Sequence, residues 1–301
     1  MAQMLPAPEP RNLLLPNGMS LRLWDYGGDG PPVLTVHGFL DTGRSWRGVA
    51  EACGADARLL CLDWRGHGQS DRVGIGGSYH QLDHLKDLIH VLTLLPDLSL
   101  TPAALAGHSM GAGIALVAAG TQPELFPKRF LILDNLGGFA MEADAYWDRV
   151  GDFLAVTKKE KHAFRSFTNR QEGLAKVMSN NPHMTEAGAG LWLDGAGKAS
   201  ADGSIELEFD AQLRGPNPFA FPENYWLELC RRVTAKTVIV APEFGYFGQL
   251  PLMQARAKVM PDVQVHHLNK SGHHVHVDAP EIVAKHLLLL LTESKESLKV
   301  D

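Results

Sequence analysis

The stretch Gly107-His108-Ser109-Met110-Gly111 decides the fold of this chain. A short apolar run at 103–106 precedes it, as a buried parallel strand would. The run at 112–119 that follows is rich in helix formers. A strand that turns sharply into a helix at a serine places the hydroxyl at the carboxyl end of the strand, in front of the helix N-terminus. The pattern predicts a serine nucleophile, and therefore a hydrolase or an acyltransferase.

A second segment, residues 32–39, carries an apolar strand directly into His37-Gly38. It matters because the pentapeptide alone is a weak signal: short glycine and serine patterns arise by chance. Acyl transfer needs two N–H donors for its tetrahedral oxyanion. We expect the backbone N–H groups of Phe39 and Met110 to form that oxyanion hole. We interpret the His37 side chain as a brace for the loop.

A third segment, residues 60–70, runs from a strand into a polar loop punctuated by glycines. Its Asp63, Arg65 and His67 have the residue types of a catalytic cluster. We interpret them instead as an ion-paired, hydrogen-bonded loop that supports the face where the nucleophile lies.

A fourth segment, residues 271–280, lies near the C-terminus and contains His273, His274 and His276. A serine hydroxyl is a poor nucleophile until a base takes its proton. Gly272-His273 directly follows a strand-like segment, so we expect His273 to be that base. His276 is then expected at a supporting position near the start of a helix.

The four segments together resemble the α/β-hydrolase fold family, whose chain order puts the histidine last. The resemblance covers about residues 13–292. It implies a triad of serine, histidine and an acid, with Ser109 and His273 as the first two members, and an acyl-enzyme intermediate. The chain is similar in more detail to the serine hydrolase-like subgroup, in Asp202-Gly203, Phe209-Asp210 and Gly245-Tyr246-Phe247.

The acid of the triad has two candidate positions. Many members of the family carry it after the penultimate strand, here 236–241, but Gly245 stands where an aspartate is expected. Some members carry it one strand earlier, and the run 130–133 ends in Asp134. The two strands are expected to be neighbours, so a carboxylate at either end can reach the same histidine. We expect Asp134 to be the acid, with Glu243 as the alternative.

The histidines near the C-terminus also raise the question of a metal. His266-His267 and the group from His273 to His276 have ligand types that suit zinc or nickel. A metal site needs further ligands at suitable geometry, and adjacent histidines on a strand point to opposite faces. We therefore expect no metal and no organic cofactor.

Strand-like and helix-like segments alternate along the chain. The segment 79–95 has Leu82, Leu85, Ile89 and Leu92 at helical spacing, and Pro16-Asn17-Gly18 suits a hairpin turn. The pattern predicts a mostly parallel eight-stranded sheet with helices on both faces, opened by an antiparallel hairpin. The eight strands are expected near 13–17, 20–26, 32–37, 58–63, 103–108, 129–134, 236–241 and 263–268.

The alternation breaks between residues 137 and 227, where aromatic residues are frequent. We expect residues 1–136 and 228–301 to form the core domain and 137–227 to form a mainly helical cap. The insertion would emerge at the carboxyl ends of the strands, where ligands bind in open α/β sheets. A cap over Ser109 would exclude water and shape an apolar pocket.

The composition is that of an ordinary globular protein. A net charge of −6 gives no electrostatic reason to expect a nucleic-acid partner, and three cysteines are too few for a disulfide framework. The run Leu287–Leu291 is too short to cross a bilayer, and the first residues lack a signal-peptide pattern. We expect a cytoplasmic protein that binds a small-molecule substrate and neither nucleic acid nor membrane.

These features predict a serine hydrolase that acts on a carboxylic ester, or a related carbonyl substrate, with an apolar portion. Carbon–carbon bond hydrolysis and lactone opening use the same residues and stay as alternatives. Two functions of other classes also stay open. One is a cofactor-free dioxygenase, in which His273 and Asp134 act as a base on the substrate. The other is a non-catalytic binding protein on the same scaffold.

Overall fold

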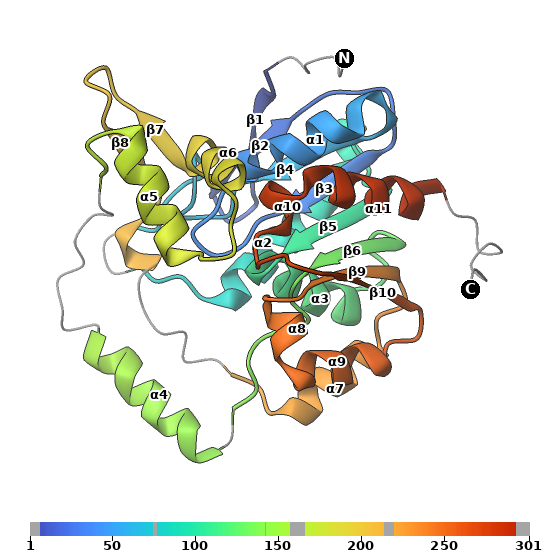
Figure 1. Cartoon of the computed structure of the whole chain (residues 1–301). Coiled ribbons are helices and arrows are strands. Elements are labelled where there is room, and N and C mark those ends of the chain that lie inside the picture. The colour runs from blue at the N-terminus through green and yellow to red at the C-terminus, as the bar shows by residue number, and fades with distance from the viewer. Residues whose placement is uncertain (1–6, 75–76, 142, 157–165, 214–219, 293–301) are drawn as a thin grey trace.

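The computed structural model describes residues 7–74, 77–141, 143–156, 166–213 and 220–292, built around one large sheet (Figure 1). The strand order is β1-β2-β4-β3-β5-β6-β9-β10. β2 pairs antiparallel with β1 and β4, and all other neighbours are parallel. The predicted mostly parallel eight-stranded sheet is confirmed. Its strands are β1 (Glu9–Leu14), β2 (Ser20–Asp25), β3 (Pro32–Val36), β4 (Arg58–Leu62), β5 (Ala104–His108), β6 (Arg129–Leu133), β9 (Lys236–Pro242) and β10 (Val263–Leu268).

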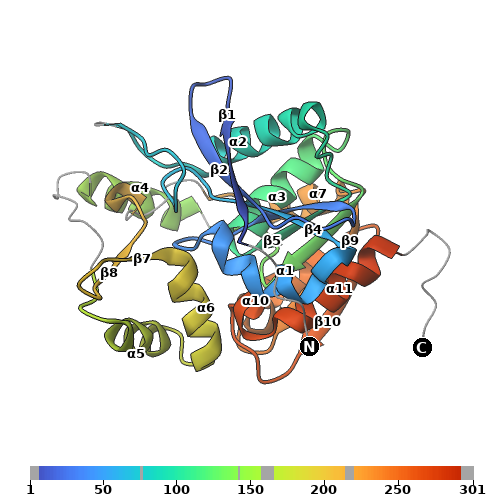
Figure 2. The same cartoon turned by 90° about the horizontal axis from the view of Figure 1, so that it is seen from above.

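The central parallel strands are apolar along their length because both faces are covered. In β6, the four residues after Arg129 are all buried, which is the continuous apolar pattern of a doubly covered strand. One face carries α1 (Arg47–Cys53), α10 (Val275–Asp278) and α11 (Pro280–Thr292). The other carries α2 (Gln81–Leu94), α3 (Met110–Thr121), α7 (Glu223–Arg231) and α9 (Pro251–Lys258), as Figure 2 shows from above.

Short helices complete the core at its turns. They are α8 (Tyr246–Gln249), η1 (Gly43–Trp46), η2 (Gly54–Asp56) and η3 (Pro96–Leu98). Within the described part of the chain, no helix is both long enough and apolar enough to cross a bilayer.

One local prediction was wrong. The first strand, expected near 13–17, ends at Leu14, because Leu15 already closes the turn: its carbonyl accepts from Gly18 N–H at 2.9 Å. Pro16 has no N–H to continue the pairing. The helix expected over 79–95 is confirmed as α2, in which Leu82 lies in the first turn and is 49% exposed, whereas Leu92 is buried in the core.

The segment expected to form the cap, called the cap below, lies between β6 and β9. It comprises α4 (Ala143–Val156), α5 (Arg170–Asn180), α6 (Glu186–Ala196), the hairpin of β7 (Gly197–Ala199) and β8 (Ile205–Leu207), and η4 (Ala211–Leu213). It has a small apolar cluster of its own, Phe167, Leu193 and Ile205. Residue 227, the expected end of the cap, lies inside α7, which packs against α3 and α9 of the core.

Backbone pairing joins the cap to the loop after β4. Gly68 N–H donates to the Glu208 carbonyl, and Asp210 N–H donates to the Gly66 carbonyl, each at 2.8 Å. On the other side of the cap, the Asp278 carboxylate accepts from the N–H and the hydroxyl of Thr185, just before α6, both at 2.8 Å. The cap is therefore attached to the core beside the carboxyl ends of the strands.

Candidate active site

Ser109 lies at the sharp turn between β5 and α3, where the sequence predicts a nucleophile. Its φ of 50° is in the left-handed region, which a non-glycine residue rarely adopts. The turn needs glycine on both sides. A Cβ at Gly107 would lie 2.7 Å from Ala112 Cα, and one at Gly111 would lie 2.5 Å from the His37 carbonyl oxygen. The strained turn presents the Ser109 hydroxyl in front of the α3 N-terminus.

The structure brings Ser109, His273 and Asp134 together. His273 Nε2 lies 2.9 Å from Ser109 Oγ, and His273 Nδ1 lies 2.5 Å from Asp134 Oδ2. The His273 side chain is 23% exposed and that of Asp134 is fully buried. The three side chains, which come from distant parts of the sequence, form one hydrogen-bonded row.

Asp134 follows β6, and its carboxylate is fixed by backbone donors. Oδ2 accepts from Tyr246 N–H and Oδ1 from Phe247 N–H, both at 2.9 Å. Burial raises the pKa of Asp134, while His273 and the two N–H groups act in the opposite direction. A Cβ at Gly245 would collide with this carboxylate. The Asp134 carboxylate therefore requires a glycine at position 245, where an aspartate is otherwise expected.

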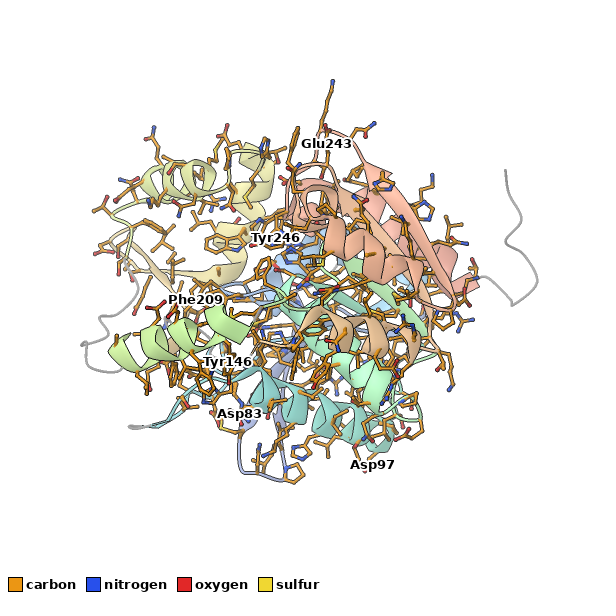
Figure 3. All side chains as sticks on the ribbon, turned by 90° about the horizontal axis from the view of Figure 1, so that it is seen from below. Asp83, Asp97, Tyr146, Phe209, Glu243 and Tyr246 are labelled. Carbon is orange, nitrogen blue, oxygen red and sulfur yellow. The ribbon has the colours of Figure 1, made fainter. Side chains whose placement is uncertain are left out.

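Glu243, the alternative acid, lies elsewhere. It follows β9, its residue is exposed, and its Oε2 accepts from Lys270 N–H at 2.7 Å. Figure 3 shows Glu243 at the rim of the molecule and Tyr246 further in. β6 and β9 are neighbours, as expected, but of the two carboxylates only that of Asp134 contacts His273.

The two expected oxyanion donors lie on either side of Ser109. Met110 is the first residue of α3, so its N–H has no partner within the helix. The backbone before Phe39 packs closely on the serine, because a Cβ at Gly38 would lie 3.1 Å from Ser109 Cβ. In the described part of the chain neither N–H is used in another hydrogen bond. Both are available to a bound oxyanion.

The loop after β4 has the structural role that the sequence suggested. Asp63 accepts from Gly43 N–H at 2.7 Å and from Gln69 N–H at 2.9 Å, and burial raises its pKa to about 6. Arg65 pairs with Asp87 through two contacts of 2.6 Å. None of these groups reaches Ser109.

His37 also braces the fold. Its Nδ1–H donates to the Gly38 carbonyl at 2.7 Å, and its Nε2 accepts from Trp64 N–H at 3.0 Å. The imidazole is fully buried, and burial lowers its pKa to about 4. His37 therefore stays neutral and holds the loop that carries Phe39.

Sequence reasoning missed a group of three behind the site: Asp41, His108 and His276. Their ligating atoms lie within 4.8 Å of one another, a spacing that a metal ion can use. However, His276 Nε2 lies 3.0 Å from both Asp41 Oδ2 and Ser45 Oγ, so its proton is shared between them. A metal on Nε2 would leave a proton on His276 Nδ1, which is buried without an acceptor. The donor set fits a hydrogen-bond network better than a metal centre.

A small hollow beside His273 is formed by the cap and the core together. Its volume is about 110 Å³, and the loop between α5 and α6 faces the residues that flank His273. The His183 ring stacks on Phe244 at 4.1 Å. Tyr246, which is 40% exposed, lies against the His273 ring at 4.6 Å and against Phe139 at 5.4 Å. Tyr246 therefore lies against the imidazole of His273, and His183 and Phe244 line the same hollow as His273.

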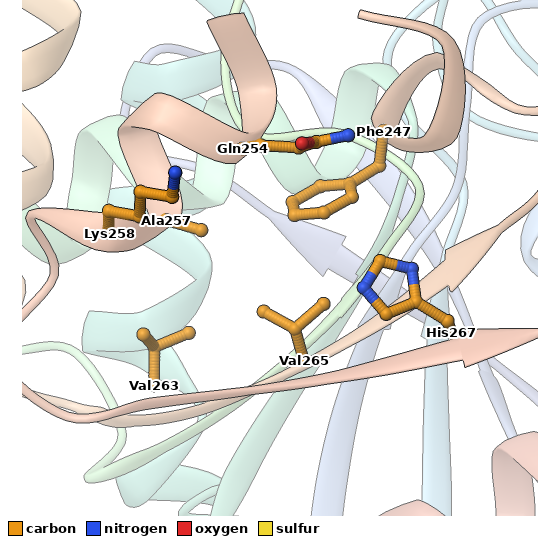
Figure 4. Close-up of a pocket in the computed structure, with 7 residues that line it drawn as sticks. All are labelled: Phe247, Gln254, Ala257, Lys258, Val263, Val265 and His267. Atoms are coloured by element: carbon orange, nitrogen blue, oxygen red, sulfur yellow. The ribbon is translucent and has the colours of Figure 1, made fainter. Parts of the chain in front are cut away.

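A second hollow, of about 290 Å³, lies away from this site between α9 and β10 (Figure 4). Val263, Val265 and His267 line it from the strand, and Lys258 lines it from the helix. It contains neither Ser109 nor His273. His266 and His267, considered as metal ligands from the sequence, lie on this edge strand.

Known proteins share this fold. A family model for the alpha/beta hydrolase fold matches residues 31–170. The chain is 25% identical over 285 residues to a serine hydrolase-like protein of Mus musculus, a match that covers 88% of this chain and 89% of the relative. A solved structure of a hypothetical protein from Pseudomonas aeruginosa PAO1 has a TM-score of 0.79 at 27% identity, covering 94% of this chain and 97% of the other.

A more local similarity is also present. The chain is 38% identical over 128 residues to the dihydrolipoyllysine-residue acetyltransferase component of the acetoin cleaving system of Pseudomonas putida. This match covers 42% of the chain but only 32% of that relative's length.

The strand order, the turn at Ser109 and the family match agree, and the chain has the α/β-hydrolase fold. Within it, the similarity that extends over most of the chain is to serine hydrolase-like proteins, as the sequence motifs indicated. The fold and these similarities support a hydrolase.

Proposed function

We propose that the chain is a serine hydrolase that cleaves a carboxylic ester with an apolar portion through an acyl-enzyme on Ser109. The observation that carries the proposal is the continuous hydrogen-bonded row from Ser109 Oγ through His273 to Asp134. The row starts at a partly exposed serine and ends at a buried carboxylate. This is the order that an activated nucleophile needs.

The tautomer of His273 follows from its neighbours. Asp134 Oδ2 can only accept when ionised, so His273 Nδ1 carries the proton that bonds it. The lone pair of Nε2 then faces Ser109 Oγ. His273 can take the serine proton, and the charged imidazolium that forms is stabilised by Asp134.

The remaining steps use the same groups. Ser109 Oγ attacks the ester carbonyl, and the N–H groups of Phe39 and Met110 stabilise the oxyanion. His273 returns its proton to the leaving alcohol. Water, deprotonated by His273, then attacks the acyl-enzyme, and the carboxylic acid is released. The reaction needs no metal or organic cofactor.

The surroundings of the triad favour an apolar small molecule. Phe39, Phe139 and Tyr246 are each at least 40% exposed, and pockets for small molecules are mostly apolar with few polar groups. A cap over the strand ends can exclude water from such a pocket. Lactones and diketones cleaved at a carbon–carbon bond would use the same residues, and the substrate panel below includes both.

The test is steady-state hydrolysis of aliphatic and aromatic esters, lactones and a diketone by the wild type, Ser109→Ala and His273→Gln. The proposal predicts ester turnover that falls by about 10⁴-fold or more in both variants. Turnover that survives in Ser109→Ala would contradict it. Oxygen uptake without ester turnover would instead favour the cofactor-free dioxygenase. In that reaction the pair of His273 and Asp134 would act as a base on the substrate. Substrate binding without turnover would favour a binding protein.

A further inference from the structure

His108 links the proposed nucleophile and base directly. It precedes Ser109 in the chain, at the last position of β5. Its Nε2 lies 3.0 Å from the backbone carbonyl oxygen of His273, and the two rings lie 4.7 Å apart. A closed ring results: the peptide bond joins Ser109 to His108, one hydrogen bond joins His108 to His273, and another joins His273 to Ser109.

The protonation of His108 can be assigned from its contacts. A carbonyl oxygen only accepts, so Nε2 carries the proton that bonds His273. The other nitrogen, Nδ1, is buried and has no hydrogen-bond partner. It lies 3.9 Å from Asp41 Oδ2, beyond hydrogen-bond distance. His108 is therefore the neutral tautomer with its proton on Nε2, and burial, which lowers its pKa well below the ordinary value, agrees.

The carboxylate of Asp41, behind His108, is itself held by hydrogen bonds to other groups. Asp41 Oδ1 accepts from Thr42 N–H at 2.8 Å, and Oδ2 accepts from His276 Nε2–H at 3.0 Å. Gly38 leaves the room that the imidazole fills, because a Cβ there would lie 2.9 Å from His108 Nδ1. The ring is thus held in one orientation, with Nε2 toward His273.

His273 needs such a contact because no strand holds it. It follows β10 in a turn that ends where α10 begins. Backbone hydrogen bonds hold the turn on either side of His273: the Ser271 carbonyl accepts from Phe244 N–H at 3.0 Å, and the His274 carbonyl accepts from two N–H groups of α10, each at 3.1 Å. Displacement of a catalytic group by about 1 Å can cost about 100-fold in rate, so the position of this turn matters for turnover.

We propose that His108 is a positioning residue, which sets the distance between Ser109 and His273 through its hydrogen bond to the His273 carbonyl. The proposal rests on the proposed function for its kinetic effect. It predicts that what counts at position 108 is an N–H donor at the reach of Nε2, not an aromatic ring or a charge.

Three variants distinguish the effect of the N–H donor of His108 from the effect of its side-chain size. His108→Gln places an amide N–H at about the reach of Nε2, His108→Met has the same length without a donor, and His108→Asn has an amide that is too short. We expect His108→Gln to keep kcat within about 3-fold of the wild type. We expect kcat to fall by about 10- to 100-fold in His108→Met and His108→Asn, with KM changed by less than about 3-fold. If His108→Met does not fold, the pair of Gln and Asn variants decides.

A purely structural role would lower thermal stability in all three variants without restoring kcat in His108→Gln alone. Equal kcat values in the Gln, Asn and Met variants would therefore overturn the proposal. A second readout needs no substrate: long-range ¹⁵N–¹H correlation spectra of the whole protein should show His108 neutral and protonated at Nε2 at about pH 7. A proton on Nδ1 would overturn the proposal independently. Absence of ester turnover in the wild type, by contrast, would count against the proposed function only.

Discussion

The carboxylate of Asp134 occupies the space that a side chain at Gly245 would fill. The backbone just after Gly245 then donates two N–H groups to that carboxylate, from Tyr246 and Phe247. An acid that follows β6 and a glycine that follows β9 are therefore coupled: the glycine admits the carboxylate, and the carboxylate orders the turn. This coupling explains why the chain departs from the commoner position of the acid.

A methyl group at position 245 should displace Asp134 from His273. We expect Gly245→Ala to lower kcat by about 100-fold or more, because the imidazole loses the acceptor that orients it. Gly74→Ala is the matched control, since a Cβ there meets nothing within 4 Å among the described residues, and its kcat should equal that of the wild type. Wild-type kcat in a folded Gly245→Ala protein would show that the coupling does not matter for activity.

The two candidate acids can be compared directly. Asp134→Asn should reduce turnover by about 10⁴-fold, on the scale of a triad acid, because the amide no longer selects the His273 tautomer with its proton on Nδ1. Glu243→Gln should change turnover by less than about 3-fold, since Glu243 is exposed and its carboxylate accepts from Lys270 N–H. Small and equal losses of turnover in both variants would contradict the assignment of Asp134 as the acid.

Acid should destabilise the fold through its buried histidines. In the unfolded chain they take up a proton near pH 6.5, whereas burial keeps them neutral to lower pH in the folded state. The unfolded state then binds more protons, so stability is lost as pH falls below about 6.5, by up to ~1.4 kcal/mol per pH unit for each histidine. The histidines are His37, with its pKa lowered to about 4, His274, with its pKa lowered to about 3, and His67, His84 and His108.

Three carboxyl groups act in the opposite direction. Burial raises the pKa of Asp63 to about 6 and also raises those of Asp134 and Asp278, so the folded state binds more protons than the unfolded state below that pH. The five histidines outnumber them, and His286, whose pKa is lowered by burial to about 4, adds to their effect. Denaturant titrations should show an unfolding free energy several kcal/mol lower at about pH 5.5 than at about pH 7.5. An unfolding free energy that stays constant or rises as pH falls from about 7.5 to about 5.5 would contradict the neutral state of the histidines.

Tyr246 should influence substrate selectivity. Its ring lies between Phe139 and His273 and is partly exposed, so an aromatic acyl group can pack on it. We expect Tyr246→Ala to raise KM for an aromatic ester by about 3- to 10-fold more than for the acetyl ester of the same alcohol. Tyr246→Phe keeps the ring and should behave as the wild type. An equal change for both esters would remove Tyr246 from the substrate pocket.

Much of the fold was predictable because it depends on local pattern. Buried parallel strands such as β6 are continuous apolar runs, and the turn at Ser109 has a specific glycine pattern. The edges of elements were harder. The hairpin ends at Leu14 because Leu15 and Pro16 belong to the turn, and no periodicity marks such a boundary.

Parts of the site were not predictable because they depend on packing between distant segments. Nothing local to His108 shows that its Nε2 reaches the His273 carbonyl, or that Asp41 lies behind it. The hydrogen bond from Tyr246 N–H to Asp134 could not be predicted from the sequence either, since nearly every residue has a backbone N–H. Gly245 was the one local signal, as a missing acid at that point implies an acid elsewhere.

The most direct test of the account is labelling of the purified protein with a fluorophosphonate, followed by mass mapping of the modified peptide. The account predicts one phosphonyl adduct on Ser109, absent in Ser109→Ala and formed much more slowly in His273→Gln. The reason is that a serine oxygen attacks phosphorus and displaces fluoride at a useful rate only when a base takes its proton. A folded wild type that is not labelled, or is labelled at another residue, would contradict the claim that Ser109 is an activated nucleophile.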